Sequence, residues 1–212
     1  MTDAAPPPSL RERKKLRTRQ ALADTAVTLF GERGFDSTPL DALLEQVEVS
    51  RRTFFRNFRS KEDVALTAVK QLWDVYLEVL DGTDDKTGPL ADVLLEAMLA
   101  TLERMDEDWY RRFPLTLRLI ADSAALDGYT LRHCAEVQAE IAHRLDGQSG
   151  PSGPNDLDDR QGPLELRLLI EFFVAAWRCA LDEWLPDCRP GELPALLLRT
   201  CSSMNAALHL EA

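Results

Sequence analysis

Three helix-capping signals, spaced about ten residues apart in the first third of the chain, set the strongest limit on its fold. Thr38 precedes Pro39, Ser50 precedes a basic segment, and Ser60 precedes a Lys-Glu-Asp sequence. Ser and Thr hydroxyls accept hydrogen bonds from the free N–H groups of a first helical turn, and proline suits the first helical position. We therefore expect two short helices between Thr38 and Ser60, with a turn of about three residues between them. This is the helix-turn-helix arrangement.

Apolar residues recur every three or four positions through most of the remaining chain, and this spacing predicts helices. The predicted long helices cover residues 10–33, 61–80, 90–105, 124–145, 164–184 and 194–210. Pro114 is expected to begin or kink a further helix, because proline interrupts the backbone hydrogen bonding of a helix interior. No segment alternates between apolar and polar residues as a strand does, so the predicted fold is all-α with about nine helices.

The predicted chain has three parts. Residues 1–8 are a proline-rich tail that we expect to be disordered, residues 9–62 form a three-helix helix-turn-helix domain, and residues 63–212 form a helical bundle. Within the bundle, residues 147–163 are rich in Gly, Pro and Asp, which predicts an exposed and mobile loop.

Charge is distributed unevenly between these parts. The net charge is −11, but residues 1–61 carry 12 Lys and Arg against 8 Asp and Glu, and residues 62–212 carry 13 against 28. A basic head on an acidic body concentrates the attraction for phosphate at one end of the molecule. The basic residues of the head form two clusters, which are Arg11, Arg13, Lys14, Lys15, Arg17 and Arg19, and Arg51, Arg52, Arg56, Arg59 and Lys61.

Several classes of protein are excluded by what the sequence lacks. It has no apolar window of about 18 residues and no apolar run after its N-terminal charges, so we expect a cytoplasmic protein without a membrane helix. Phosphate-loop, GxSxG and HExxH motifs are absent, so no enzymatic activity, metal or cofactor is expected. The four cysteines form no CxxC pair and are expected to be idle thiols, with a redox-sensing pair as the alternative.

The second short helix, from Ser50 to Arg56, is the candidate recognition helix. It carries Arg51, Arg52, Thr53 and Arg56 at positions that the core does not need. Such side chains suit base edges and phosphates. The alternative is a solvated basic helix in an ordinary helical bundle.

The stretches LFGERGFDSTPLDALLEQV and VSRRTFFRNFRSKEDV resemble the DNA-binding domain of TetR-family transcriptional regulators. The resemblance implies that the recognition helix binds DNA, that Thr38 and Lys61 contact phosphates, and that the ring of Phe55 packs on the sugar-phosphate backbone. Where the family often has glycine, this chain has Glu48. Either the turn avoids a positive φ there, or it carries some strain.

The resemblance also implies what the C-terminal part does. In the family, the last two helices form a four-helix dimer interface, and the bundle senses a ligand. The segments RRFPLTLRLI and ALDEWL are similar to an actinobacterial branch of regulators associated with mycofactocin clusters.

A ligand pocket is expected among aromatic and charged side chains of the middle helices. The candidate ligand-binding residues are Trp73, Trp109, Phe113, Arg118 and Trp177. Arg118 lies in the apolar segment PLTLRLIA, so we expect it to be partly buried and neutralised by an acid. That acid is either Asp122, four residues on, or an acidic group of the ligand.

The function predicted from the sequence is a ligand-responsive DNA-binding regulator. We expect a homodimeric repressor that binds a palindromic double-stranded DNA operator through recognition helices about 34–36 Å apart. An unknown small-molecule effector would release it by acting through the helix predicted at residues 61–80. The alternative is an orphan regulator with no small ligand or with a protein partner.

Overall fold

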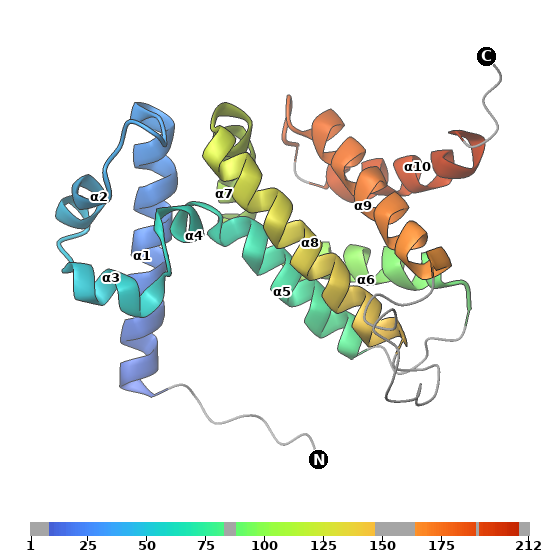
Figure 1. Ribbon diagram of the computed structural model, residues 1–212, viewed down its shortest axis with the longest axis horizontal. Coiled ribbons are helices and arrows are strands. Elements are labelled where there is room, and N and C mark those ends of the chain that lie inside the picture. Colours follow the sequence, from blue (N-terminus) through green and yellow to red (C-terminus); the bar gives the residue numbers. More distant parts are fainter. Residues whose placement is uncertain (1–8, 83–87, 147–163, 190, 208–212) are drawn as a thin grey trace. The chain divides into compact units, whose positions relative to one another are not determined.

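The computed structural model describes residues 9–82, 88–146, 164–189 and 191–207, and within these ranges the chain is helical with no strand. The helices are α1 (Leu10–Arg33), α2 (Leu40–Gln46), α3 (Arg51–Asn57), α4 (Lys61–Ala65), α5 (Thr67–Asp81), α6 (Leu90–Arg104), α7 (Glu107–Asp122), α8 (Ala124–Asp146), α9 (Leu164–Trp184) and α10 (Glu192–Ala207), as Figure 1 shows. The predicted all-α fold is confirmed. The predicted tail at 1–8 and the predicted loop at 147–163 lie outside the described residues.

One helix predicted over residues 61–80 is two helices in the structure. Leu66 separates α4 from α5, with φ −92° and ψ 16°, and its N–H bonds to the carbonyls of Glu62 and Val64. The Thr67 hydroxyl donates to the Val64 carbonyl at 2.7 Å, which offers that carbonyl a partner other than the helical one. Leu66 itself is fully buried, so tertiary packing rather than a breaker residue sets this break.

The chain divides into two compact units. The first contains the residues up to Ala68 together with Leu115–Tyr129, and the second contains Val69–Pro114 and the residues from Thr130 onward. The sequence predicted one boundary after residue 62 and did not assign residues 115–129 to the first unit. They belong there because Leu119 and Leu126 are buried in the same apolar core as α1–α4.

The core of the first unit explains how its short helices are held. Leu22 and Phe30 of α1 pack with Leu43 of α2. The same apolar core contains Phe54, in the last turn of α3, and Phe58, at the C-cap of that helix. All five side chains are at most 2% exposed. Helices of about seven residues are marginal alone, so this shared burial keeps α2 and α3 folded.

The capping signals are confirmed at two of three positions. The Ser50 side chain accepts a hydrogen bond from the Thr53 N–H, and Ser60 accepts one from the Asp63 N–H. Thr38 does not cap α2, contrary to our expectation. Its hydroxyl donates to the Gly34 carbonyl at 2.7 Å, and Pro39 occupies the N-cap position without a side-chain hydrogen bond.

The second unit has a core rich in aromatic side chains. Trp109 and Phe113 of α7 stack with ring centroids 4.3 Å apart, and Phe113 also faces Trp177 and Trp184 of α9. Of the two roles expected for Pro114, the start of a helix is wrong, because α7 begins at Glu107, where the Asp106 carboxylate accepts a hydrogen bond from the Trp109 N–H. It then continues through Pro114, which is buried.

The turn between α2 and α3 has a regular hydrogen-bonding pattern. The Val49 N–H bonds to the Leu44 carbonyl and the Glu48 N–H to the Glu45 carbonyl, which together form a Schellman motif. The residue after the helix C-cap in this motif is left-handed, and Glu48 has a φ of 55°. Of the two possibilities raised by the sequence, the turn therefore has the positive φ and accepts the strain.

We predict that Glu48→Gly stabilises the first unit. Glycine reaches a φ of 55° without a Cβ clash, and removing this strain is worth about 1 kcal/mol. Urea unfolding followed by circular dichroism checks the change. The matched control is Gln46→Gly, at the last helical position of α2, which should destabilise the unit by about 0.5–1 kcal/mol. Equal losses of stability in both variants would contradict the strain at Glu48.

Candidate nucleic-acid interface

Helix α3 has one buried side and one exposed basic side. Phe54 is fully buried and Phe58 follows at the C-cap, whereas Arg51, Arg52 and Arg56 are exposed. Phe55 is also 54% exposed, which is unusual for so large an apolar ring. The buried Phe54 therefore turns Arg52, Arg56 and the Phe55 ring away from the core, as side chains must be turned to reach a DNA groove.

The first turn of α3 is held by its own capping residue. Ser50 Oγ lies 3.2 Å from the Thr53 N–H and 3.1 Å from Thr53 Oγ1. Thr53 is half-buried. Both residues were predicted to bind DNA, and in the structure their hydroxyl groups already contact each other at the start of the helix.

Arg51 is held by a carboxylate from the preceding helix. Its Nε donates to Asp41 Oδ1 at 2.8 Å, and its Nη2 donates to Asp41 Oδ2 at 2.5 Å. The hydrogen bond from Arg51 lowers the pKa of Asp41, so the carboxylate is ionised at neutral pH. The bridge links the first turn of α2 to the first turn of α3, and the sequence analysis did not predict it.

The C-terminal end of α3 is attached to α1 by Arg19. The Arg19 Nη1 donates to the Asn57 carbonyl at 2.6 Å, and the guanidinium lies 4.5 Å from the centroid of the Phe58 ring. Sequence reasoning placed Arg19 in the first basic cluster. Helical spacing could have separated it, because Arg19 precedes the buried Ala23 and Ala26 by four and seven positions and so lies on the same side of α1.

Lys61 and Thr38, both predicted phosphate contacts, are engaged inside the first unit. The Lys61 ammonium donates to the carbonyls of Phe35 and Thr38 at 2.8 and 3.1 Å, and lies 4.0 Å from the Phe35 ring centroid. Thr38 is 1% exposed, its hydroxyl donates to Gly34, and its N–H donates to Phe35. Their contacts with phosphate stay predictions, and Lys61 would have to use its third N–H.

The first half of α1 carries the other basic cluster. Every residue from Leu10 to Arg17 is exposed, and the first fully buried residue of the helix is Leu22. A capping box at the N-terminus, in which Ser9 and Glu12 exchange hydrogen bonds, stabilises this exposed segment. The helix therefore presents its cations outside the apolar core.

The predicted ligand-binding residues do not form an open pocket. Trp73, Trp109, Phe113 and Trp177 are at most 3% exposed, and the last three stack on one another or on shared neighbours. Trp73 makes an edge contact with Tyr76, whose pKa is raised by burial. These aromatic side chains pack the core of the second unit.

Arg118 differs from the expectation most clearly. It is exposed, so the premise that it is a partly buried charge is wrong. The buried guanidinium of this segment belongs to Arg112, which is 6% exposed. Arg118 directly precedes Leu119, and because neighbouring positions on a helix point about 100° apart, burying Leu119 turns Arg118 toward solvent.

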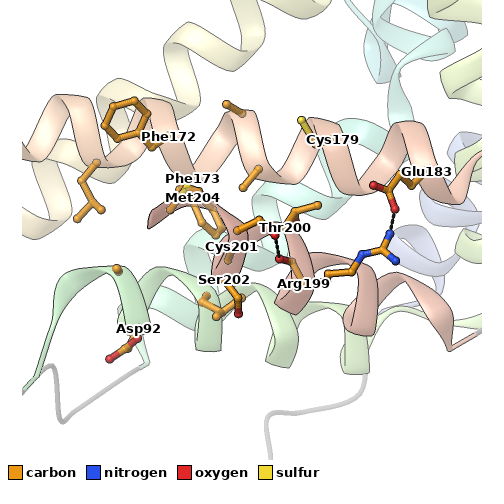
Figure 2. A pocket seen from close by; sticks show the side chains of 16 residues that line it. Asp92, Phe172, Phe173, Cys179, Glu183, Arg199, Thr200, Cys201, Ser202 and Met204 are labelled. Carbon is orange, nitrogen blue, oxygen red and sulfur yellow. Dashed lines mark hydrogen bonds and ion pairs between the residues drawn. The ribbon is translucent and has the colours of Figure 1, made fainter. Parts of the chain in front are cut away.

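The second unit has a groove of about 740 Å³ between α6, α9 and α10 (Figure 2). Phe172, Phe173 and Ala176 of α9 line it, and so do Thr200 and Met204 of α10. None of the five predicted ligand-binding residues lines this groove. Large apolar side chains are exposed on the two C-terminal helices, namely Leu164, Leu168, Phe172 and Leu198.

None of the four cysteines, all of which lie within the described residues, forms a disulfide. Burial raises the pKa of the Cys134 and Cys201 thiols, which disfavours the reactive thiolate. Within the described ranges, we find no helix with the length and apolarity needed to cross a membrane.

Comparisons with known proteins agree with this architecture. The family described as "Bacterial regulatory proteins, tetR family" matches residues 22–68. The chain is 32% identical over 182 residues to the HTH-type transcriptional regulator TcmR of Streptomyces glaucescens, covering 84% of this chain and 77% of that protein. It is 23% identical over 127 residues to the biofilm operon icaADBC HTH-type negative transcriptional regulator IcaR of Staphylococcus epidermidis, covering 60% and 66%.

A solved structure has the same fold. A transcriptional regulator of the TerR/AcrR family from Aquifex aeolicus VF5 superposes with a TM-score of 0.53 at 17% identity, covering 90% of this chain and 99% of that chain. The chain belongs to the TetR family of bacterial transcriptional regulators, a family of DNA-binding proteins that act as dimers. The finer assignment to a mycofactocin-associated branch stays a prediction.

We predict that Lys61→Met destabilises the first unit and also lowers the salt dependence of DNA binding. Two charge-assisted hydrogen bonds to carbonyls are lost from a half-buried site, at a cost of about 1–2 kcal/mol. If the third N–H binds a phosphate, the slope of log affinity against log salt falls by about 0.9. Thermal unfolding and salt titrations measure the two effects. An unchanged slope with a lowered melting temperature would show that Lys61 is structural only.

Proposed function

We propose that this chain is a transcriptional repressor that binds a palindromic operator as a homodimer. The observation that supports this proposal best is the exposed side of α3, where Arg51, Arg52 and Arg56 surround Phe55. Arginine is the side chain best suited to read guanine in the major groove, and an exposed ring packs against the backbone or a thymine methyl group. The protein acts in the cytoplasm, where its operator lies.

The exposed cations of α1 add sequence-independent affinity. Arg11, Arg13, Lys14, Lys15 and Arg17 lie within two turns of one helix and outside the core. Contacts between such side chains and phosphates release counterions and supply most of non-specific binding. The acidic remainder of the chain repels DNA and so favours approach through this end.

The proposed dimer interface is the exposed apolar surface of α9 and α10. Phe172 and Leu168 of α9 and Leu198 of α10 are each more than 40% exposed, and the groove in Figure 2 lies beside Phe172. Four large apolar side chains exposed on one helix pair form a surface of the kind that a second copy covers. A two-fold axis through these helices would present two α3 helices to a palindromic operator.

The proposal includes a small-molecule effector, with an orphan regulator as the alternative. The closed packing of the predicted ligand site supports the alternative. An effector bound among Trp109, Phe113 and Trp177 would have to separate rings that stack 4.3 Å and 6.4 Å apart. A ligand that does so stabilises the state it binds and changes tryptophan fluorescence. A thermal-shift screen with fluorescence detection tests this, and a response from any compound class would restore the ligand-responsive reading.

The DNA-binding function is tested by selecting duplexes from a randomised library with the wild-type chain and by footprinting on DNA that flanks its own gene. We predict that Arg52→Ala weakens binding to the selected duplex by about 1–3 kcal/mol, because one bidentate base contact is lost. Arg104→Ala, which removes an equally exposed arginine from α6, is the control and should leave affinity unchanged. The absence of any enriched sequence would refute sequence-specific binding altogether.

The dimer is tested at Phe172, which is 43% exposed. We predict that Phe172→Glu shifts the protein to monomers, because a carboxylate cannot be buried unpaired between two copies. Sedimentation velocity measures the mass, and affinity for the selected palindrome should fall with it. Leu131→Glu on α8, at a leucine that is 55% exposed, is the matched control and should stay dimeric. A dimeric Phe172→Glu variant would place the interface elsewhere.

A further inference from the structure

The Arg51–Asp41 pair has a side-on geometry that leaves part of the guanidinium unoccupied by the carboxylate. Asp41 accepts from Nε and from Nη2, which lie along one edge of the planar group. Arginine has five N–H donors in a rigid fork. The Nη1 and Nη2 hydrogens that point away from the side chain form a second pair of parallel donors, and Asp41 does not use that pair. Two parallel donors of this kind match O6 and N7 of guanine, which an arginine contacts bidentately.

This pair contributes little to folding. The side chains of Arg51 and Asp41 are 64% and 53% exposed, and ion pairs this exposed contribute little because water and salt screen them. The pair instead fixes the orientation of the Arg51 side chain. A free arginine loses much rotamer entropy when it is fixed against a base, and a side chain already fixed before binding loses less.

The residue that fixes Arg51 is itself well positioned. Asp41 lies in the first turn of α2, and α2 is anchored by the buried Leu43 and Leu44 and closed by the Schellman turn at Glu48. Asp41 and Arg51 also line one shallow surface depression together with Glu45 and Glu48. The orientation of Arg51 is therefore determined by a neighbouring helix rather than by α3 alone.

We propose that Asp41 is a positioning residue for DNA recognition, which holds Arg51 side-on so that its terminal edge is presented to a guanine of the operator. The proposal rests on the DNA-binding function proposed above. Asp41 itself adds negative charge near the phosphates and so weakens binding to DNA of any sequence. A residue that lowers general affinity and raises base preference increases the ratio of specific to non-specific binding, which is the quantity that selects an operator within a genome.

The test compares base preferences among five proteins, namely the wild type, Asp41→Asn, Asp41→Ala, Glu45→Gln and Arg51→Ala. Glu45→Gln is the matched control, because it removes the same charge from the same helix at an exposed position. Each protein is used at full length to select duplexes from a randomised library. Affinities are then measured for the duplex that the wild type selects, for its single base-pair variants, and for a scrambled duplex.

We expect Arg51→Ala to remove a guanine preference of roughly tenfold at one base pair of each half-site. Asp41→Asn should reduce the preference at that same base pair by about threefold, since the arginine remains but is no longer held by two charge-assisted hydrogen bonds. Glu45→Gln should keep the wild-type preference. Both acid-to-amide variants should bind the scrambled duplex slightly and equally better, because each removes one negative charge.

Two results would overturn the proposal. One is an unchanged preference at the Arg51 base pair in Asp41→Asn and also in Asp41→Ala, which removes both acceptor atoms. The other is an equal loss in Glu45→Gln, which would show a general effect of charge. Failure of the proposed function gives a different result, since the wild type would then enrich no sequence. Circular dichroism melts confirm that the variants are folded.

Discussion

The burial of Phe54 in the apolar core of the first unit is the constraint on which the candidate DNA interface depends. Helix α3 has seven residues, too few to persist alone, and Phe54 is fully buried within it. Because successive helical positions point about 100° apart, fixing Phe54 inward turns Arg52, Phe55 and Arg56 away from the core. The edge contact between the rings of Phe54 and Phe55, with centroids 5.2 Å apart, couples the buried ring to the exposed one.

Three polar contacts add to this apolar packing in joining the helices of the first unit. Arg19 binds the last carbonyl of α3, Asp41 binds Arg51 at its start, and Lys61 joins the segment between α1 and α2 to α4. Arg19, Asp41 and Lys61 therefore help to fix the positions of the short helices within the first unit. The exposed cations on α1 and on the outer side of α3 are best placed to contact DNA directly, and Arg51 joins them through the edge that Asp41 does not occupy.

The aromatic residues of the second unit show why a closed core and a ligand pocket are hard to distinguish from sequence. Tryptophan and phenylalanine at helical spacing suit both a closed core and a ligand pocket, because both environments are apolar. Here Trp109, Phe113 and Trp177 are stacked and buried, whereas the groove of the unit lies beside Phe172 and α10. The exposed Phe172 belongs to the surface that we propose as the dimer interface, whereas the stacked rings are buried in the core of the unit.

Local chemistry was enough to predict the helical class, the short helices and the outward side of α3. Ser50 and Ser60 cap helices because a hydroxyl beside free N–H groups does so in any fold, and the basic residues of the second short helix were expected at positions that the core does not need. Only the tertiary structure decided which partner each charged group takes. Lys61 and Phe35 lie 26 positions apart, and Arg19 and Asn57 lie 38 apart. No sequence spacing encodes these contacts, because they depend on where α1, α3 and α4 meet. The same reason applies to Arg118, whose exposure follows from the burial of Leu119 in a unit formed mainly by residues more than fifty positions earlier.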